Sequence, residues 1–166
     1  MTALKDILYK VAIEAVKGTT DVSVGKIEFD SRKIESDDVF VAIRGTVSDG
    51  HDFIEKAISL GAIAVVCEVV PQTTHDGITY VQVADTSLAL AYMSANYYGD
   101  PSAKLKLVGV TGTNGKTTIA SLLYQMFKKA GYKVGLLSTV KILVDNKEYK
   151  ATHTTPDSFT INHYIN

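Results

Sequence analysis

The chain has 166 residues, of which 46% are hydrophobic and 21% are charged, with a formal net charge of −1. Such a composition predicts one ordinary folded domain or two small ones, and it excludes an intrinsically disordered protein. The nearly balanced charge, without any run of Lys or Arg, lacks the electrostatic footprint of a nucleic-acid-binding protein, so no nucleic acid is expected as a partner.

Apolar residues at helical spacing predict a first helix over 4–15, with Thr2 as its cap and Gly18 as its stop. The charged start of this segment is unlike a signal peptide, and no apolar run in the sequence reaches membrane-spanning length. We therefore expect a cytoplasmic protein without membrane insertion.

Hydrophobic periodicity and turn residues predict the next elements in chain order. They are strands over 26–29, 39–43, 63–67 and 78–83, helices over 52–60 and 85–98, and a loop over 71–77. One face of the last helix is expected to carry Leu88, Ala91, Tyr92 and Ala95. The Gly-Asp-Pro-Ser run at 99–102 breaks this helix, so we place a boundary there between domains of residues 1–100 and 101–166.

The second domain is predicted to open with a strand over 107–110, a glycine-rich loop, a helix that ends at Gly131 and a strand over 134–139. This order is that of the first βαβ unit of a parallel sheet. A last helix is predicted with Pro156 at its first position. The residues after 100 are too few for a complete doubly wound sheet, so we expect the chain to be a fragment of a longer protein.

The segment that joins the predicted strand and helix has the composition of a phosphate-binding loop. Gly112 and Gly115 allow the backbone to fold around a phosphate with its N–H groups pointing inward, and the helix start adds the positive end of its dipole. Lys116 is then placed to reach the β and γ phosphates of a nucleoside triphosphate, and the Thr117 hydroxyl to bind magnesium. The segment therefore predicts a nucleotide site.

This loop departs from the usual G-x-x-x-x-G-K-[ST] pattern, because Val110 stands where the first glycine is expected. Apolar residues at helical spacing follow the loop, as a phosphate loop requires. They are Ile119, Leu122, Leu123, Met126, Phe127 and Ala130. The alternative interpretation is a glycine turn before an ordinary helix.

The run from Thr111 to Thr118 resembles the ATP loop of the Mur ligases, the ATP-dependent amide-bond-forming enzymes of peptidoglycan synthesis. Folylpolyglutamate synthases are similar, but they usually carry Gly-Ser after the lysine. The resemblance implies ATP and Mg²⁺ as cofactors, Lys116 as a catalytic residue and Thr117 as a magnesium ligand. The ATP-binding residues that it implies are Gly112, Thr113, Asn114, Gly115, Lys116, Thr117 and Thr118.

Polar segments at 29–32, 37–45 and 49–53 are, by composition, turns around strands, in which Asp30, Arg32 and His51 are turn and surface residues. Their order and spacing are similar to the N-terminal domain of the Mur ligases, which binds the uridine diphosphate end of a sugar nucleotide. That likeness implies five residues that contact the substrate. They are Phe29, Ser31, Thr46, Val47 and Ser48. Arg32 either adds a bond to this ligand or pairs with Asp30 or Asp37.

The run from Thr152 to Asp157 resembles the Mur ligase segment that usually reads Asn-Thr-Thr-Pro and binds the muramoyl-dipeptide part of the acceptor. The resemblance implies substrate contacts at His153, Thr154 and Thr155, with His153 in place of the usual asparagine. An alternative role for Thr155 is a helix N-cap. This run and the ATP loop favour the members that add the third residue of the stem peptide over their next-step relatives.

The fold implied is α/β, with a small N-terminal α/β substrate domain followed by the truncated start of a phosphate-loop parallel-sheet ATPase domain. The parent would activate the carboxylate of UDP-N-acetylmuramoyl-L-alanyl-D-glutamate as an acyl phosphate, which the amine of a diamino acid then attacks. We expect the fragment alone to lack this activity. The alternatives are a non-catalytic nucleotide or UDP-sugar binding module and a small phosphate-loop kinase. Lysine and meso-diaminopimelate both remain open, as does the oligomeric state.

Other polar residues are expected to be structural. Cys67, the only cysteine, is predicted in a buried strand, which leaves no disulfide or cysteine metal cage within one chain. Asp145 resembles the magnesium-positioning acid of phosphate-loop enzymes, but Asp145-Asn146 is better explained as a turn between antiparallel strands. His75 and His163 are expected to be solvated rather than to bind a metal.

Overall fold

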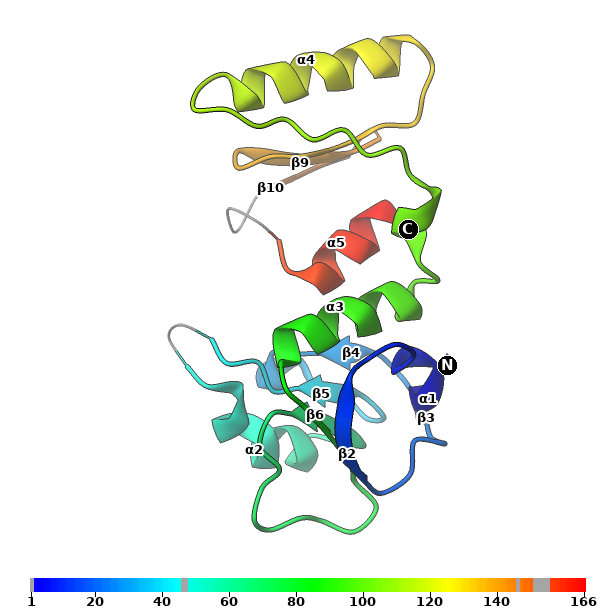
Figure 1. Cartoon of the computed structure of the whole chain (residues 1–166), viewed down its shortest axis with the longest axis vertical. Coiled ribbons are helices and arrows are strands. Elements are labelled where there is room, and N and C mark those ends of the chain that lie inside the picture. Colours follow the sequence, from blue (N-terminus) through cyan, green and yellow to red (C-terminus); the bar gives the residue numbers. More distant parts are fainter. Residues whose placement is uncertain (1, 46–47, 146, 151–155) are drawn as a thin grey trace. The chain divides into compact units, whose positions relative to one another are not determined.

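The structure is a computed structural model that describes residues 2–45, 48–145, 147–150 and 156–166 (Figure 1). The chain divides into two compact units, Met1–Gly99 and Asp100–Asn166. Each unit combines helices with a β-sheet, and the first sheet contains parallel strands, which confirms the predicted α/β class. Among the described residues, no helix has both the length and the apolar character needed to cross a membrane.

A five-stranded sheet forms the centre of the first unit, in the order β2-β7-β6-β5-β4. Its strands are β2 (Ile13–Lys17), β4 (Ile27–Glu28), β5 (Val39–Val41), β6 (Ala64–Cys67) and β7 (Thr79–Val83). Strands β4 to β7 are parallel to one another, and β2 pairs antiparallel with β7 at the edge. The short strands β1 (Thr2–Ala3) and β3 (Ser23–Val24) form a separate antiparallel pair. Four of the predicted strands are therefore confirmed.

Helices lie on both faces of this sheet (Figure 1). They are α1 (Leu4–Ile7), α2 (Ile54–Ser59) and α3 (Thr86–Tyr97), with the 3₁₀ turns η1 (Ser31–Lys33) and η2 (Gly50–Phe53). The register places Phe40, Val65 and Tyr80 side by side, and these residues belong to one buried cluster with Ile54 and Ala57 of α2. The alternate residues of the strands point to the opposite face, where α3 lies (Figure 1). Burial on both faces is what an all-parallel strand set requires.

The predicted first helix over 4–15 is wrong beyond Ile7. The backbone of Lys10 is left-handed, with φ 62°, and the segment from Ile13 becomes strand β2. Its backbone hydrogen-bonds to β7, and this pairing with a distant segment overrides the local helical spacing. Gly18, with φ +106°, therefore ends a strand and not a helix, and Thr2 lies in β1 and caps nothing.

Helix α3 is confirmed, and its buried face is not the one that carries Leu88 and Tyr92. Leu88 and Tyr92 are 53% and 43% exposed. The residues that point into the core are Thr86, Ala89, Leu90, Met93 and Ser94. Apolar residues occur on all sides of this helix, so their spacing does not identify the buried face. The hydroxyl of Ser94 is accommodated in the core because it donates to the Leu90 carbonyl at 2.6 Å.

The second unit holds η3 (Pro101–Lys104), α4 (Lys116–Lys129), α5 (Ser158–Ile165) and a three-stranded sheet in the order β10-β9-β8. The strands are β8 (Gly135–Leu137), β9 (Lys141–Val144) and β10 (Lys147–Lys150), and both pairs are antiparallel. The predicted helix after the loop and the strand over 134–139 are confirmed. So is the turn at Asp145, which has φ 52° between β9 and β10.

Two predictions for this unit are wrong. Residues 107–110 form no strand, and Leu107 is 91% exposed, because no described strand pairs with this segment. The predicted βαβ unit is therefore not formed, and β8 pairs with β9 instead. Helix α5 is capped by Asp157, whose Oδ1 accepts the Thr160 N–H at 2.8 Å, so Pro156 precedes the cap and is not the first helical residue.

The buried carboxylate of Asp38 allows a test of the first unit. It accepts the Lys26 N–H at 3.1 Å and the Glu35 N–H at 2.7 Å. Asp38→Ala leaves both N–H groups without a partner, so we expect it to destabilise this unit by about 1–3 kcal/mol. Amide hydrogen exchange at Lys26 and Glu35 should accelerate. Glu35→Ala is the matched control, because its side chain is 78% exposed, and it should change little. Unchanged exchange in Asp38→Ala would contradict the assignment.

Candidate functional site

The glycine-rich loop before α4 has the backbone geometry of an anion site. Gly112 and Gly115 have φ +148° and +77°, in the range that favours glycine. Gly115 is the N-cap of α4 and provides no side chain to bond the first-turn N–H groups. The first intrahelical bond runs from the Ile119 N–H to the Gly115 carbonyl at 2.9 Å. The N–H groups of residues 116–118, which have no intrahelical partner, are therefore available to an anion together with the helix dipole.

The side chain of Lys116 folds back over this loop. Its ammonium donates to the Gly112 carbonyl at 2.5 Å and lies 3.4 Å from the Thr113 carbonyl. Both oxygens belong to the loop itself, so the cation is held across the loop. Thr117 is half-buried in the first turn of α4, whereas Thr113 and the rest of the loop are exposed. The loop can therefore receive a ligand from solvent.

A second group of predicted site residues lies where β4 ends. The Glu28 carboxylate accepts the N–H groups of Phe29 and Asp30, both at 3.0 Å, and so turns the chain out of the strand. Ser31 follows as the first residue of η1 and is only 7% exposed. Phe29 and Ser31 are thus held at the carboxyl end of a parallel strand. Open α/β sheets bind ligands at this end of their strands.

Arg32 pairs with Asp30, one of the two carboxylates that the sequence offered as its partner. The guanidinium donates from Nε and Nη2 to the two carboxylate oxygens, each at 2.8 Å, and Asp30 also accepts the Arg32 N–H at 3.1 Å. The Arg32 side chain, by these bonds, lowers the pKa of Asp30 to about 2, although desolvation opposes the shift. Arg32 therefore helps to shape the turn that holds Ser31.

Ser48, in the predicted substrate loop, lies at the same end of the sheet. It follows β5, which is the parallel neighbour of β4, so the carboxyl ends of both strands lie on the same side. The Gly45 N–H donates to the Ser48 carbonyl at 3.0 Å, and Arg44 and Asp49 form a β-bridge at the base of the loop. Thr46 and Val47 lie outside the described residues, as do His153, Thr154 and Thr155.

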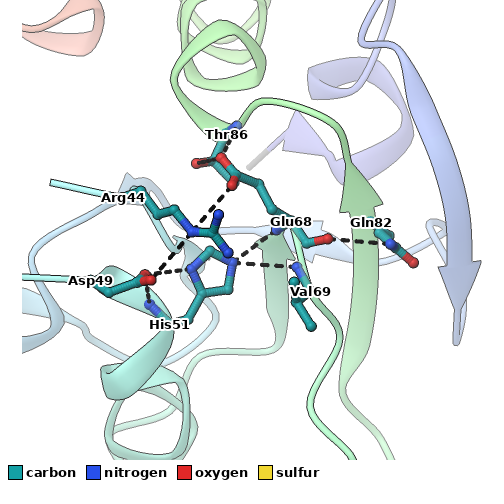
Figure 2. Close-up of polar contacts among 7 residues, drawn as sticks. All are labelled: Arg44, Asp49, His51, Glu68, Val69, Gln82 and Thr86. Carbon is teal, nitrogen blue, oxygen red and sulfur yellow. Dashed lines mark hydrogen bonds and ion pairs between the residues drawn. The ribbon is translucent and has the colours of Figure 1, made fainter.

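A network of polar side chains supports this loop (Figure 2). The Arg44 Nε lies 3.3 Å from the Asp49 carboxylate and 3.4 Å from that of Glu68. Glu68 Oε1 in turn accepts the Thr86 hydroxyl at 3.0 Å and the Thr86 N–H at 3.2 Å. The Gln82 amide donates to the Glu68 carbonyl at 3.2 Å. The network therefore joins the loop to β6, β7 and the first turn of α3.

The sequence did not identify Glu68, Gln82 and Thr86 as residues that support the loop. One signal could have found Glu68, since an acidic residue directly after a buried parallel strand lies at the carboxyl end of the sheet, where ligands bind.

Of the other candidates, Cys67 is buried as predicted, and burial raises the pKa of its thiol to about 11, which makes it a poor nucleophile. His75 is 45% exposed and pairs with Glu55. The described residues contain no group of three His, Cys, Asp or Glu that could hold a metal ion.

Both units match models of one family. Residues 110–166 match the Mur ligase middle domain. Residues 23–98 match the model described as Mur ligase family, catalytic domain. The chain belongs to the Mur ligase family. The resemblance inferred from the ATP loop and from the strand-end segments is thereby confirmed.

Individual relatives agree with this assignment. The UDP-N-acetylmuramoyl-L-alanyl-D-glutamate–2,6-diaminopimelate ligase of Cytophaga hutchinsonii is 54% identical over 161 residues, which are 96% of this chain and 33% of that protein. The ligase of the same name from Phocaeicola vulgatus is 48% identical over 159 residues, again 96% and 33%. This Mur ligase chain thus spans about a third of the length of the relatives that it matches.

Solved structures show the same fold. A structure titled UDP-N-acetylmuramoyl-L-alanyl-D-glutamate–2,6-diaminopimelate ligase aligns with a TM-score of 0.71 over 99% of this chain and 32% of its own, and at 21% identity this likeness shows the fold alone. A MurF structure from Acinetobacter baumannii aligns with a TM-score of 0.51 at 31% identity, over 65% of this chain and 23% of its own.

The Asp30–Arg32 pair should determine how the turn that holds Ser31 responds to pH. Because the folded pKa of Asp30 is lowered from 3.8 to about 2, the pair stabilises the fold above the unfolded pKa, and this contribution is lost as the pH falls through about 2. NMR titration of the Asp30 carboxyl carbon should show this midpoint. Arg32→Ala should raise it toward 3.8, whereas Lys33→Ala, which removes a weaker influence, should move it little. An equal shift in both variants would contradict the pairing.

Proposed function

We propose that this chain supplies the UDP-sugar site and the ATP loop of a ligase that adds 2,6-diaminopimelate to UDP-N-acetylmuramoyl-L-alanyl-D-glutamate. The observation that carries the proposal is the glycine loop at the start of α4, with the Lys116 ammonium held across it. The names of the relatives support the identity proposed for the acceptor and for the amino acid that is added. The cytoplasmic location expected from the sequence is part of the same proposal.

The chemistry assigned to the loop is phosphoryl transfer from ATP to the acceptor carboxylate. The backbone N–H groups from Gly112 to Thr118 would bind the phosphates, and Lys116 would exchange its two loop carbonyls for phosphate oxygens and neutralise charge that develops on them. The hydroxyl of Thr117 would be a ligand for Mg²⁺, which supplies further charge neutralisation when bound. The amine of the diamino acid then displaces phosphate from the resulting acyl phosphate.

The binding of the sugar nucleotide is assigned to the first unit, which the proposal treats as a substrate domain of residues 1–100. Phe29 and Ser31 at the end of β4, and Thr46, Val47 and Ser48 after β5, would contact the uridine diphosphate. Support comes from their position at adjacent carboxyl ends of parallel strands. His153, Thr154 and Thr155 are proposed to contact the muramoyl-dipeptide, within an ATP-binding domain that begins at residue 101.

The ATP site is tested by Lys116→Ala. An ammonium that bonds phosphate contributes a charge-assisted interaction, so its removal should weaken magnesium-ATP binding by about ten- to a hundredfold. Isothermal calorimetry on the 166-residue chain measures this change. Lys129→Ala is the matched control, since Lys129 lies in the last turn of the same helix, and it should bind ATP like the wild type. Equal affinity for Lys116→Ala and the wild type would refute the ATP assignment.

The UDP-sugar site is tested by titrating the ¹⁵N-labelled chain with UDP-N-acetylmuramoyl-L-alanyl-D-glutamate. Amide shift changes should concentrate at Phe29, Ser31 and Ser48, because their segments lie at one edge of the sheet. Ser31→Ala should weaken binding by roughly tenfold, the effect of one hydrogen bond to a charged group, whereas Ser59→Ala, at the end of α2, should not. Shift changes confined to residues 111–118 would show that the ligand binds elsewhere.

A further inference from the structure

His51 lies between the candidate substrate loop and the end of β6 (Figure 2). Its side chain is only 14% exposed, although the residue follows a glycine in a polar turn. Nδ1 lies 2.6 Å from Asp49 Oδ1. On the other side of the ring, Nε2 lies 2.9 Å from the Glu68 backbone nitrogen and 3.4 Å from that of Val69. Both ring nitrogens therefore have partners within the protein.

These partners determine which nitrogen carries the proton. A backbone N–H can only donate, so Nε2 must accept and be unprotonated. An ionised carboxylate can only accept, so Nδ1 must carry the hydrogen toward Asp49. The Asp49 carboxylate is held in this form because bonds from the His51 backbone N–H and ring, with Arg44 nearby, lower its pKa. The neutral Nδ1–H ring is the one form that satisfies both sides.

The segment that this ring joins to β6 is also closed at its base. The Gly50 N–H donates to the Ile43 carbonyl at 2.8 Å, and a Cβ at position 50 would approach the Ile43 backbone to 2.7 Å. The Arg44–Asp49 bridge lies next to this contact. Arg44 and Asp49 are thus held together at one point of the fold, and the His51–Asp49 bond helps to attach that point to the end of β6.

We infer that His51, in its Nδ1–H tautomer, is a positioning residue that orients Ser48 and Asp49, at the carboxyl end of the sheet, for the uridine diphosphate ligand. This inference rests on the proposed function of the candidate substrate loop. His51 itself does not contact the ligand or transfer a proton, because Asp49 and the Glu68 N–H engage both of its ring nitrogens. It acts through Asp49, which lies one residue after Ser48.

The tautomer is tested first, by long-range ¹H–¹⁵N correlation spectra of the wild-type 166-residue chain at a pH where the rings are neutral. We expect the Nε2 shift of His51 to be that of an unprotonated nitrogen and its Nδ1 shift that of a protonated one. His75 is an internal control with the opposite arrangement, because its Nε2 faces the Glu55 carboxylate at 2.7 Å and should carry the hydrogen. An Nε2–H tautomer at His51 would overturn the inference.

The positioning role is tested by three substitutions and a control. His51→Ala removes both bonds and should weaken binding of UDP-N-acetylmuramoyl-L-alanyl-D-glutamate by about tenfold or more, with shifted amide signals at Gly45 and Ser48 in the free protein. His51→Asn keeps a donor near the Nδ1 position, and His51→Gln keeps an acceptor near the Nε2 position. We expect Asn to restore most of the affinity, because the bond to Asp49 orients the loop. His75→Gln should bind like the wild type.

The outcomes separate this inference from the function on which it rests. A wild-type chain that does not bind the sugar nucleotide would contradict the proposed function, whatever the tautomer of His51. A wild type that binds, together with a His51→Ala variant that binds equally well, would contradict the inference alone. Rescue by Gln but not by Asn would overturn the role given to Asp49. If His51→Ala fails to fold, the wild-type tautomer and the Asn and Gln variants still decide the question.

Discussion

Parallel pairing between neighbours in the strand order β4-β5-β6-β7 is the constraint on which the first unit depends. In this register Phe40, Val65 and Tyr80 form one continuous apolar row, and the alternate residues of the same strands are buried on the other side. A sheet buried on both faces leaves only its ends for polar chemistry. Glu28, Arg44 and Glu68, which follow or end three adjacent strands, therefore gather at one edge.

The candidate anion site of the second unit consists of backbone groups and one lysine from a single short segment. Two glycines with positive φ and an uncapped helix start concentrate N–H groups within a few consecutive residues, and Lys116 adds one positive charge. Such a site needs no partner from elsewhere in the sequence. The edge of the first sheet is different, because Ser31, Ser48 and Glu68 come together only when strands pair correctly.

This difference explains how much the sequence could predict. The phosphate loop, helix α4 and the buried strands β5, β6 and β7 were predicted because their signals are local: glycine spacing, a helical apolar period and short apolar runs. The helix over 4–15 failed because β7 supplies backbone partners that local spacing cannot reveal. The strand over 107–110 failed for the converse reason, since an apolar run becomes a strand only where another strand pairs with it. The roles of the site residues remain predictions.

The role inferred for His51 depends on the contacts of its ring nitrogens, which the sequence does not indicate. From the sequence His51 is one histidine in a polar turn, like His75, and nothing in the surrounding letters separates the two. In the fold both face a carboxylate, but through different ring nitrogens, and of the two rings it is that of His51 that also accepts a backbone N–H, from Glu68 directly after β6. The His51 side chain bonds Asp49 on one side and the chain at the end of β6 on the other. The position of β6 therefore constrains the position of Asp49. The ring of His75 is exposed and bonds the exposed carboxylate of Glu55, so it is the second partner that makes His51 a candidate for a role in binding.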